Sequence, residues 1–310
     1  MAIPSLRQAL QTASDQQRAL GHFNFSDLVV LKAVADTARQ LDVPVVVGVS
    51  EGEREFVGLR QAAALVKSLR EQYGQPIYLN ADHTHSLEKS MEAARAGFDL
   101  IVFDLSKLPF EENAKQTKQA VEALKSINPD ILVEAEVGYI GSSSTLHDAK
   151  PEGVDPLTTP EQARQFVHET RIDLFAPSVG TMHGMLKSMV TGNEHKHLDL
   201  DRIRQIKAAT SIFLTLHGGS GTDRKELAAG VHAGLDLIHI NTELRVAWRR
   251  GIEKSLEENP TEVTPYKLLP DAYANVAAVV KSLLQLVSVQ DPPLSSSAAA
   301  GAESASKIVS

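Results

Sequence analysis

The chain has 310 residues, of which 43% are hydrophobic and 23% are charged, and it contains no cysteine. The lack of thiols excludes a disulfide scaffold and limits any metal site to nitrogen and oxygen ligands. A formal net charge of −8 argues against nucleic acid or an anionic membrane as a partner, because surfaces that bind either are basic. The chain has no basic and apolar leader and no apolar run of about 18 residues, so we expect a cytoplasmic protein.

Short apolar runs alternate with segments of helical spacing along most of the chain. The expected strands are residues 21–25, 44–50, 77–83, 100–105, 131–137, 174–180, 212–218 and 236–242, and the expected helices are residues 28–41, 59–73, 86–96, 111–127, 160–170, 199–209, 223–233 and 243–258. Runs such as VPVVVGVS have no polar face, which is typical of a parallel strand covered on both sides. Eight units of about 30 residues predict an α/β fold, the (β/α)8 TIM barrel. An open doubly wound sheet is the alternative, but the GxGxxG motif usual after its first strand is absent.

Three segments lie outside this alternation. Residues 138–159 form a long loop rich in glycine and serine, and a loop of that length in a compact domain is usually functional or disordered. Residues 271–289 have the spacing of an amphipathic helix that packs on the barrel or on a partner subunit. Residues 290–310 are low in complexity and carry too little apolar surface to fold alone. We therefore predict one barrel domain with a C-terminal helix over residues 1–289, followed by a disordered tail over residues 290–310.

Histidines follow three of the expected strands, at the end of a TIM barrel where active sites form. His83, His183 and His217 lie at or just beyond the ends of the third, sixth and seventh strands. A single histidine is more often a loop or core residue, but three at matching strand ends favour a catalytic zinc site with an open fourth position. Asp104 and Glu136 end neighbouring strands, where they are expected to hold a second divalent or monovalent cation or to orient the histidines.

The other histidines and one further carboxylate have alternative explanations. His83 and His85 form an HxH pair, typical of metal-dependent barrel hydrolases, although in those enzymes the pair closes the first strand and here it closes the third. Glu134 has the same strand parity as Glu136, so it is expected to face the barrel interior, where an ion pair with lysine or arginine is the structural alternative. Loop or core positions without comparable partners at strand ends are expected for His22, His147, His168, His195, His197 and His232, and Lys196 is expected in a polar loop.

Two glycine- and hydroxyl-bearing turns predict an anion site. The stretch LHGGSG lies between the seventh strand and a helix, and HINTELR leads from the eighth strand into the next helix. Backbone N–H groups in such turns, together with helix N-termini, form the phosphate pocket that recurs after strands 7 and 8 of these barrels. The candidate contacts are Gly218, Gly219, Ser220, Asn241 and Thr242, with Lys187 as an added cation.

Seven stretches of the chain resemble motifs of the class II, metal-dependent ketose-bisphosphate aldolases, the fructose- and tagatose-bisphosphate group. In chain order they are HFNFSD, NADHTH, IVFDLSKLPFEEN, VEAEVG, VGTMHGMLK, LHGGSG and IHINTELR. They extend over about residues 1–287, which is nearly the whole predicted barrel. The resemblance is specific for this superfamily and much less so for the substrate.

The resemblance implies aldol cleavage and condensation of a ketose 1,6-bisphosphate through the enediolate of dihydroxyacetone phosphate. It implies zinc on His83, His183 and His217, a second or transient metal position at Asp104 and Glu136, and Asp82 as the acid/base. The implied contacts to phosphate and ketose are Asn24, Ser50, Gly184, Lys187, Gly218, Gly219, Ser220, His239, Asn241 and Thr242. It also implies phosphorylated ketoses and aldehydes as substrates and a homodimer or homotetramer.

Two positions depart from the family pattern. The family follows its fifth strand with G-G-x-E-D, whose loop glutamate moves the proton, whereas this chain reads GYIGSSST, and His147, Asp148 or Glu152 are the candidate replacements. The strand-8 asparagine that contacts the enediolate aligns with His239, and Asn241 follows two residues later. The substrate therefore differs from fructose bisphosphate, the mechanism is modified, or the activity is weak. The alternative is a barrel that binds metal and sugar phosphate without aldolase turnover.

Overall fold

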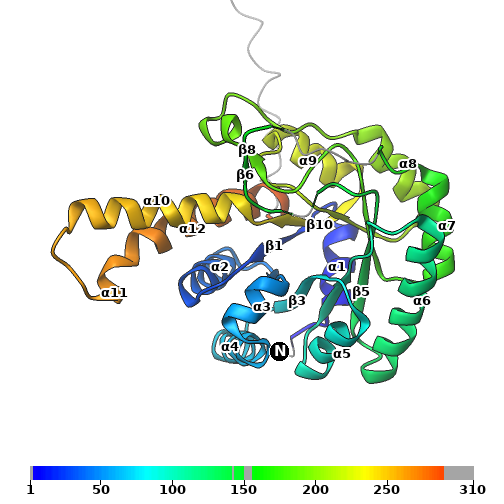
Figure 1. Cartoon of the computed structure of the whole chain (residues 1–310), viewed down its shortest axis with the longest axis horizontal. Helices are drawn as coiled ribbons and strands as arrows, with labels where there is room; N and C mark the ends of the chain where they lie inside the picture. The colour runs from blue at the N-terminus through cyan, green and yellow to red at the C-terminus, as the bar shows by residue number, and fades with distance from the viewer. Residues whose placement is uncertain (1–2, 142, 150–155, 290–310) are drawn as a thin grey trace, which may run out of the picture.

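A closed barrel of parallel strands forms the centre of the molecule (Figure 1). The computed structural model describes residues 3–141, 143–149 and 156–289. The barrel strands are β1 (Leu20–Asn24), β2 (Val45–Val49), β3 (Ile77–Thr84), β4 (Leu100–Phe103), β5 (Leu132–Val137), β7 (Leu174–Pro177), β9 (Phe213–Leu216) and β10 (Leu235–Ile240). They pair in the order β1, β10, β9, β7, β5, β4, β3, β2, and β2 closes on β1. The predicted TIM barrel is confirmed.

A ring of helices covers the outer face of the strands (Figure 1). These helices are α2 (Leu28–Leu41), α4 (Leu59–Tyr73), α5 (Leu87–Ala96), α6 (Phe110–Ile127), α7 (Pro160–Thr170), α8 (Leu200–Thr210), α9 (Arg224–Ala233) and α10 (Thr242–Glu258). Local sequence accounts for their starts, since Asp27 accepts a hydrogen bond from the Val30 N–H at α2 and Asp223 accepts from two N–H groups at α9. All eight lie within one residue of the predicted ranges.

Several further elements decorate this frame. They are α1 (Leu6–Asp15), α3 (Glu51–Val57), the two-stranded sheet of β6 (Leu146–His147) and β8 (Met185–Leu186), the 3-10 helix η1 (Lys187–Thr191), α11 (Pro265–Leu268) and α12 (Pro270–Val287). The predicted C-terminal helix is α12, which packs against α2 and α10. A Cβ at Gly251 of α10 would lie 2.4 Å from the Ala272 Cα, so glycine permits the close approach of α10 and α12. The division into one domain and a tail stays a prediction, because residues 290–310 lie outside the described residues.

Apolar side chains fill the amino-terminal end of the barrel. Leu6 and Leu10 of α1 pack against a ring of strand residues, namely Leu20, Val46, Tyr78, Leu100, Leu132, Leu174 and Leu237. A capping box at Ser5 and Gln8 begins α1 just before this contact. The amino end is therefore closed, and the polar strand ends gather at the opposite end. None of the helices in the described ranges is long and apolar enough to span a membrane.

Candidate metal centre and active site

Three histidines and one glutamate meet at the carboxyl end of the barrel. His83 comes from β3, Glu136 from β5, His183 from the loop between β7 and β8, and His217 follows β9. Each of the four residues offers one potential metal-binding atom, and these four atoms all lie within 4.8 Å of one another. The ring centroid of His83 lies 4.7 Å from that of His183 and 4.8 Å from that of His217. The fold thus brings together the three histidines that the sequence singled out.

An irregularity in β3 turns His83 into this cluster. The pairing of β3 with β4 shifts register between Ala81 and Thr84. His83 itself has a φ of 41°, in the left-handed region that side chains with a Cβ rarely adopt. Bulges of this kind re-aim side chains, and strained residues cluster at functional sites.

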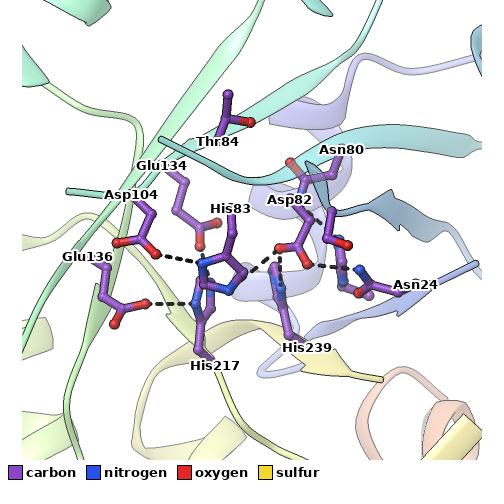
Figure 2. A network of polar contacts seen from close by, with 12 residues as sticks. Asn24, Asn80, Asp82, His83, Thr84, Asp104, Glu134, Glu136, His217 and His239 are labelled. Atoms are coloured by element: carbon purple, nitrogen blue, oxygen red, sulfur yellow. Dashed lines mark hydrogen bonds and ion pairs between the residues drawn. The ribbon is translucent and has the colours of Figure 1, made fainter. Parts of the chain in front are cut away.

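Carboxylates contact one ring nitrogen of His83 and both ring nitrogens of His217 (Figure 2). His83 Nδ1 lies 2.8 Å from Asp104 Oδ2, and Asp104 also accepts hydrogen bonds from the Ser106 backbone N–H and hydroxyl. His217 lies between two glutamates, with Nδ1 3.0 Å from Glu136 and Nε2 2.6 Å from Glu134. Asp104 therefore orients His83, as one of its two expected roles requires. Glu134 pairs with a histidine, and the expected alternative of a lysine or arginine partner is wrong.

The charges of this cluster favour a cation. Burial disfavours the charged imidazole of His83, but Asp82 and Asp104 outweigh it and raise its pKa to about 9. Burial also opposes the charge of His217, yet its two glutamates raise the pKa well above the usual value. For His183, burial and the other two histidines lower the pKa well below normal. Without a metal, protons on His83 and His217 balance the carboxylates.

The residues present fit a divalent metal ion. The Nε2 atom of His183 is buried without a hydrogen-bond partner, so this nitrogen is available to coordinate a metal ion in the cluster. Neutral imidazoles with a nearby carboxylate are a ligand set that zinc accepts. Burial and the charge of Asp104 raise the pKa of Glu136, so a cation there would relieve an unfavourable buried carboxylate.

Asp82 lies beside the cluster, with one oxygen anchored by Asn24 and the other facing His83 and His239 (Figure 2). Its Oδ2 accepts a hydrogen bond of 2.8 Å from the Asn24 amide, which also donates to Glu53. Its Oδ1 makes no hydrogen bond and lies 3.4 Å from His239 Nδ1. Burial alone would raise the pKa of Asp82, but His83 and His239 hold it well below the usual range. An ionised carboxylate with a free oxygen can accept a proton.

His22 belongs to this site. The expectation from the sequence, that it has no comparable partners at strand ends, is wrong. Its ring stacks on His239, with centroids 3.6 Å apart and planes 7° apart. Its Nε2 lies 2.9 Å from the Asn80 amide nitrogen. A Cβ at Gly48 would lie 2.4 Å from the His22 ring, so only glycine leaves room for the stack. The sequence did contain a signal for this position, because His22 and Asn24 are two residues apart on β1 and so lie on the same face of the strand.

Backbone and hydroxyl groups border a small pocket next to the histidines. Its lining residues are Asn24, Asp82, His83, Ser144, His183, Gly184, Gly218, Ser220, His239, Asn241 and Thr242. Helix α10 begins at Thr242, so its positive N-terminus faces this region. The Ser220 hydroxyl accepts from the N–H groups of Asn241 and Glu243, which ties the two predicted turns together.

Three expected substrate contacts lie elsewhere. The Gly219 N–H donates to the His239 carbonyl, so it is engaged within the protein. The exposed Lys187 ammonium forms an ion pair of 2.7 Å with Asp148. Ser50 is half-buried and begins α3. None of the three is among the residues that line the pocket.

The loop after β5 brings none of its described candidate bases into the pocket. His147 packs over Gly184, where a Cβ would lie 2.3 Å from its Nε2, and Asp148 pairs with Lys187. Glu152 lies outside the described residues. The Ser144 carbonyl accepts from Thr242 and Arg245 and so reaches the pocket wall.

His85 lies away from the metal cluster. Its side chain is half exposed, and its Nδ1 lies 2.9 Å from the Asp104 backbone carbonyl. The groups of potential ligands found among the described residues do not include His85. The barrel hydrolase alternative needs both His83 and His85 as ligands, so this geometry contradicts it.

Comparisons with known proteins point to one family. A family model described as "Fructose-bisphosphate aldolase class-II" matches residues 4–291. A "Probable fructose-bisphosphate aldolase" of Bacillus subtilis (strain 168) is 32% identical over 275 residues, covering 88% of this chain and 93% of the relative. The solved YdjI aldolase of Escherichia coli K12 has a TM-score of 0.77 at 25% identity, covering 92% of this chain and 97% of that one. The fructose-bisphosphate aldolase of Campylobacter jejuni, at 18% identity and a TM-score of 0.75, covers 91% of this chain and 93% of its own and supports the fold.

The family match extends over nearly the whole chain, and the Bacillus subtilis relative is 32% identical over 88% of it. The resemblance inferred from seven sequence motifs is confirmed. The enzyme class expected from it, a carbon–carbon lyase of the class II aldolase type, is confirmed by the same matches. The chain belongs to the class-II fructose-bisphosphate aldolase family.

Proposed function

We propose that this enzyme catalyses the zinc-dependent aldol cleavage and condensation of a ketose 1,6-bisphosphate of the fructose or tagatose type. One observation carries the proposal: His83 and His183 of the metal cluster, the Asp82 carboxylate and the backbone-lined anion pocket border a single cavity. Membership of the family supports a sugar phosphate as the substrate and a metal as the cofactor.

In this proposal His83, His183 and His217 hold the zinc ion. Glu136 lies close enough to serve as a second or transient ligand, and Asp104 keeps the His83 ring in place. When bound, the ion supplies positive charge beside the substrate ketone, where negative charge develops as the C3–C4 bond breaks. Glu134 fixes the His217 ring at Nε2, which leaves Nδ1, on the side of Glu136, as the nitrogen available to a metal ion.

Asp82 is the proposed acid/base. In cleavage its free Oδ1 takes the proton from the C4 hydroxyl, and in condensation it returns that proton to the aldehyde-derived oxygen. Asn24 keeps the other oxygen in place and is itself tied to Glu53. Glu53 in turn pairs with Arg245 at 2.7 Å, so β1, α3 and α10 together fix the carboxylate.

The proposed phosphate subsite is formed by Gly184, Gly218, Ser220 and Thr242. These residues come from two glycine turns and the start of α10, where N–H groups and the helix dipole favour an anion. His239 and Asn241 border the same pocket and are the proposed contacts to the ketose.

Retro-aldol cleavage tests this function. Purified enzyme is given fructose or tagatose bisphosphate, and triose phosphate release is followed before and after treatment with a chelator. We expect cleavage of at least one sugar, loss of activity on chelation and recovery with zinc. The exposed His232→Ala variant serves as a control that leaves activity unchanged, whereas His183→Ala removes it. Cleavage that survives complete metal removal would sink the zinc mechanism.

One observation favours a second candidate, a barrel that binds metal and sugar phosphate without turnover. The family's loop glutamate is missing, and neither His147 nor Asp148 lines the pocket. This candidate predicts stoichiometric binding of zinc and of dihydroxyacetone phosphate together with no cleavage of any ketose bisphosphate.

We further propose a cytoplasmic homodimer or homotetramer. The α10–α11–α12 arm projects from the barrel, and its tip exposes Val263 and Tyr266 at 85% and 74% (Figure 1). Exposed apolar side chains on a projecting arm are typical of a subunit interface. Light scattering coupled to gel filtration measures the mass directly, and a monomer at micromolar concentration would contradict this assembly.

A further inference from the structure

Lys196 lies buried directly behind the anion pocket. Only 5% of it is exposed, and its Nζ donates to the carbonyl oxygens of Met182, Gly184 and Gly218 at 2.7, 2.5 and 2.8 Å. Gly184 and Gly218 themselves line the pocket. Lys196 lies in a loop, as expected, but its side chain is buried. Its neighbours in sequence give no sign of this, because burial depends on where two other loops run.

The surroundings of Lys196 match the charged form of its amine. An ammonium group has three N–H donors and no acceptor, and here three acceptors meet it. Burial lowers the pKa of Lys196 to about 7, against the opposing charge of Glu243. A buried cation whose hydrogen bonds all go to carbonyls costs free energy of folding. That cost suggests a role beyond packing.

The three carbonyls belong to the loops that carry the site. Met182 and Gly184 flank His183, and Gly218 follows His217. Gly184 and Gly218 have φ values of 75° and 63°, a backbone conformation that favours glycine. A Cβ at Gly218 would lie 2.4 Å from the Met182 oxygen, so glycine is needed for the two loops to approach.

Converging carbonyl oxygens present negative potential, which opposes an anion in the adjoining pocket. We propose that Lys196 is a positioning residue for the substrate phosphate: its ammonium acts as a cation tethered to the chain, which holds the two pocket loops together and offsets the charge of their carbonyls. This inference rests on the phosphate subsite of the proposed function. Lys196 touches the pocket wall and not the phosphate itself.

Backbone hydrogen bonds hold Lys196 beside the loop that follows His217. Its N–H donates to the Gly221 carbonyl, and its own carbonyl accepts from the Asp223 N–H. Three carbonyl oxygens also suit a dissociable potassium or ammonium ion. Because the lysine fills that position, the wild-type protein is expected to bind phosphate equally well in potassium and in tetramethylammonium buffers of equal ionic strength.

Calorimetric titration of the zinc-loaded protein with inorganic phosphate tests the proposal. We expect Lys196→Met to raise the Kd by about tenfold or more and the KM of the ketose bisphosphate in proportion, with a smaller change in kcat. The exposed Lys225→Met is the matched control and leaves both unchanged. Lys196→Ala is expected to regain phosphate affinity when potassium or ammonium replaces tetramethylammonium, because a free cation can enter the vacated position.

Two results would overturn the proposal. One is a folded Lys196→Met protein that binds phosphate as the wild type does, and the other is a Lys196→Ala protein equally weak in all three salts, which would leave only a structural role. If both variants fail to fold, a potassium requirement of wild-type binding contradicts the tethered cation, and its absence supports it. Phosphate binding without aldol cleavage would reject the proposed function alone, and a wild type that binds no phosphate would reject the subsite as well.

Discussion

The two ends of the barrel are built from opposite kinds of residue. At the amino end α1 plugs the interior, and Leu6 and Leu10 bury against a ring of apolar strand residues. At the carboxyl end, the same strands present the buried carboxylates of Asp82 and Glu136 and the partly exposed ring of His83. Apolar burial stabilises a fold, whereas buried charges cost free energy unless they are paired. The barrel thus separates the residues that keep it folded from those proposed to do chemistry, and each end can be perturbed alone.

The largest expected effect is on catalysis, from Asp82→Asn at the carboxyl end. The amide keeps the shape of the side chain but cannot accept the C4 hydroxyl proton, so kcat should fall by about a thousandfold, or about 4 kcal/mol in barrier height. Steady-state cleavage assays measure this. The melting temperature should fall by no more than a few degrees, because Asp104 still pairs with His83 when the Asp82 charge is lost. A large drop in melting temperature with kcat nearly intact would show that the two ends do not divide their tasks.

The converse change is Leu10→Ala at the amino end. Leu10 is fully buried in the plug, and its truncation should lower the free energy of unfolding by about 3 kcal/mol through lost contacts and a cavity. Urea denaturation measures the loss. Metal content and kcat/KM are expected to match the wild type at temperatures where the variant is folded. A variant of normal stability with impaired metal binding would contradict the separation.

A pH effect of intermediate size should come from His22. Burial lowers its pKa from 6.5 to about 4, so the folded protein keeps it neutral while the unfolded chain protonates it. Its contribution to stability is therefore complete above pH 6.5 and is lost as the pH falls towards 4, by about 2 kcal/mol at pH 5 relative to pH 7. The advantage of wild type over His22→Asn in unfolding free energy should shrink by that amount between pH 7 and pH 5. A constant difference would show that His22 does not resist protonation.

The smallest effect belongs to a surface pair at the amino end. Arg7 of α1 forms an ion pair with Asp173, and the arginine side chain is 51% exposed. Asp173 also binds Lys125 and the Val133 N–H, so it keeps partners when Arg7 is lost. Arg7→Ala should cost less than about 1 kcal/mol, and added salt should reduce the difference further. Urea melts at low and high salt measure this, and a loss comparable to that of Leu10→Ala would be inconsistent with a plug held by apolar contacts.

Much of the barrel was readable from local patterns. The apolar runs and the helix caps depend on neighbouring residues, so the expected ranges agree with the helices and strands. His83, His183 and His217 were found because a barrel places all strand ends at one rim. Once eight strands were recognised, their meeting followed from topology.

The features that were missed depend on contacts distant in sequence. Helix α1 precedes the first strand and breaks the alternation, and only a closed barrel gives its apolar face a partner; the Ser5 and Gln8 capping box was the available signal. His22 meets His239 because β1 pairs with β10, the closure between the first and last strands. Lys196 is buried by two loops that lie close in space but not in sequence.

Proton exchange at the carbon next to the ketone tests the central claim most directly, because it needs no knowledge of the sugar. Dihydroxyacetone phosphate is incubated with the enzyme in deuterium oxide, and loss of its hydroxymethyl C–H signal is followed by NMR. The account predicts exchange by the zinc-loaded wild type and none after chelation or in His183→Ala. Zinc-loaded protein that binds dihydroxyacetone phosphate without any exchange, or exchange that persists without metal, would contradict it.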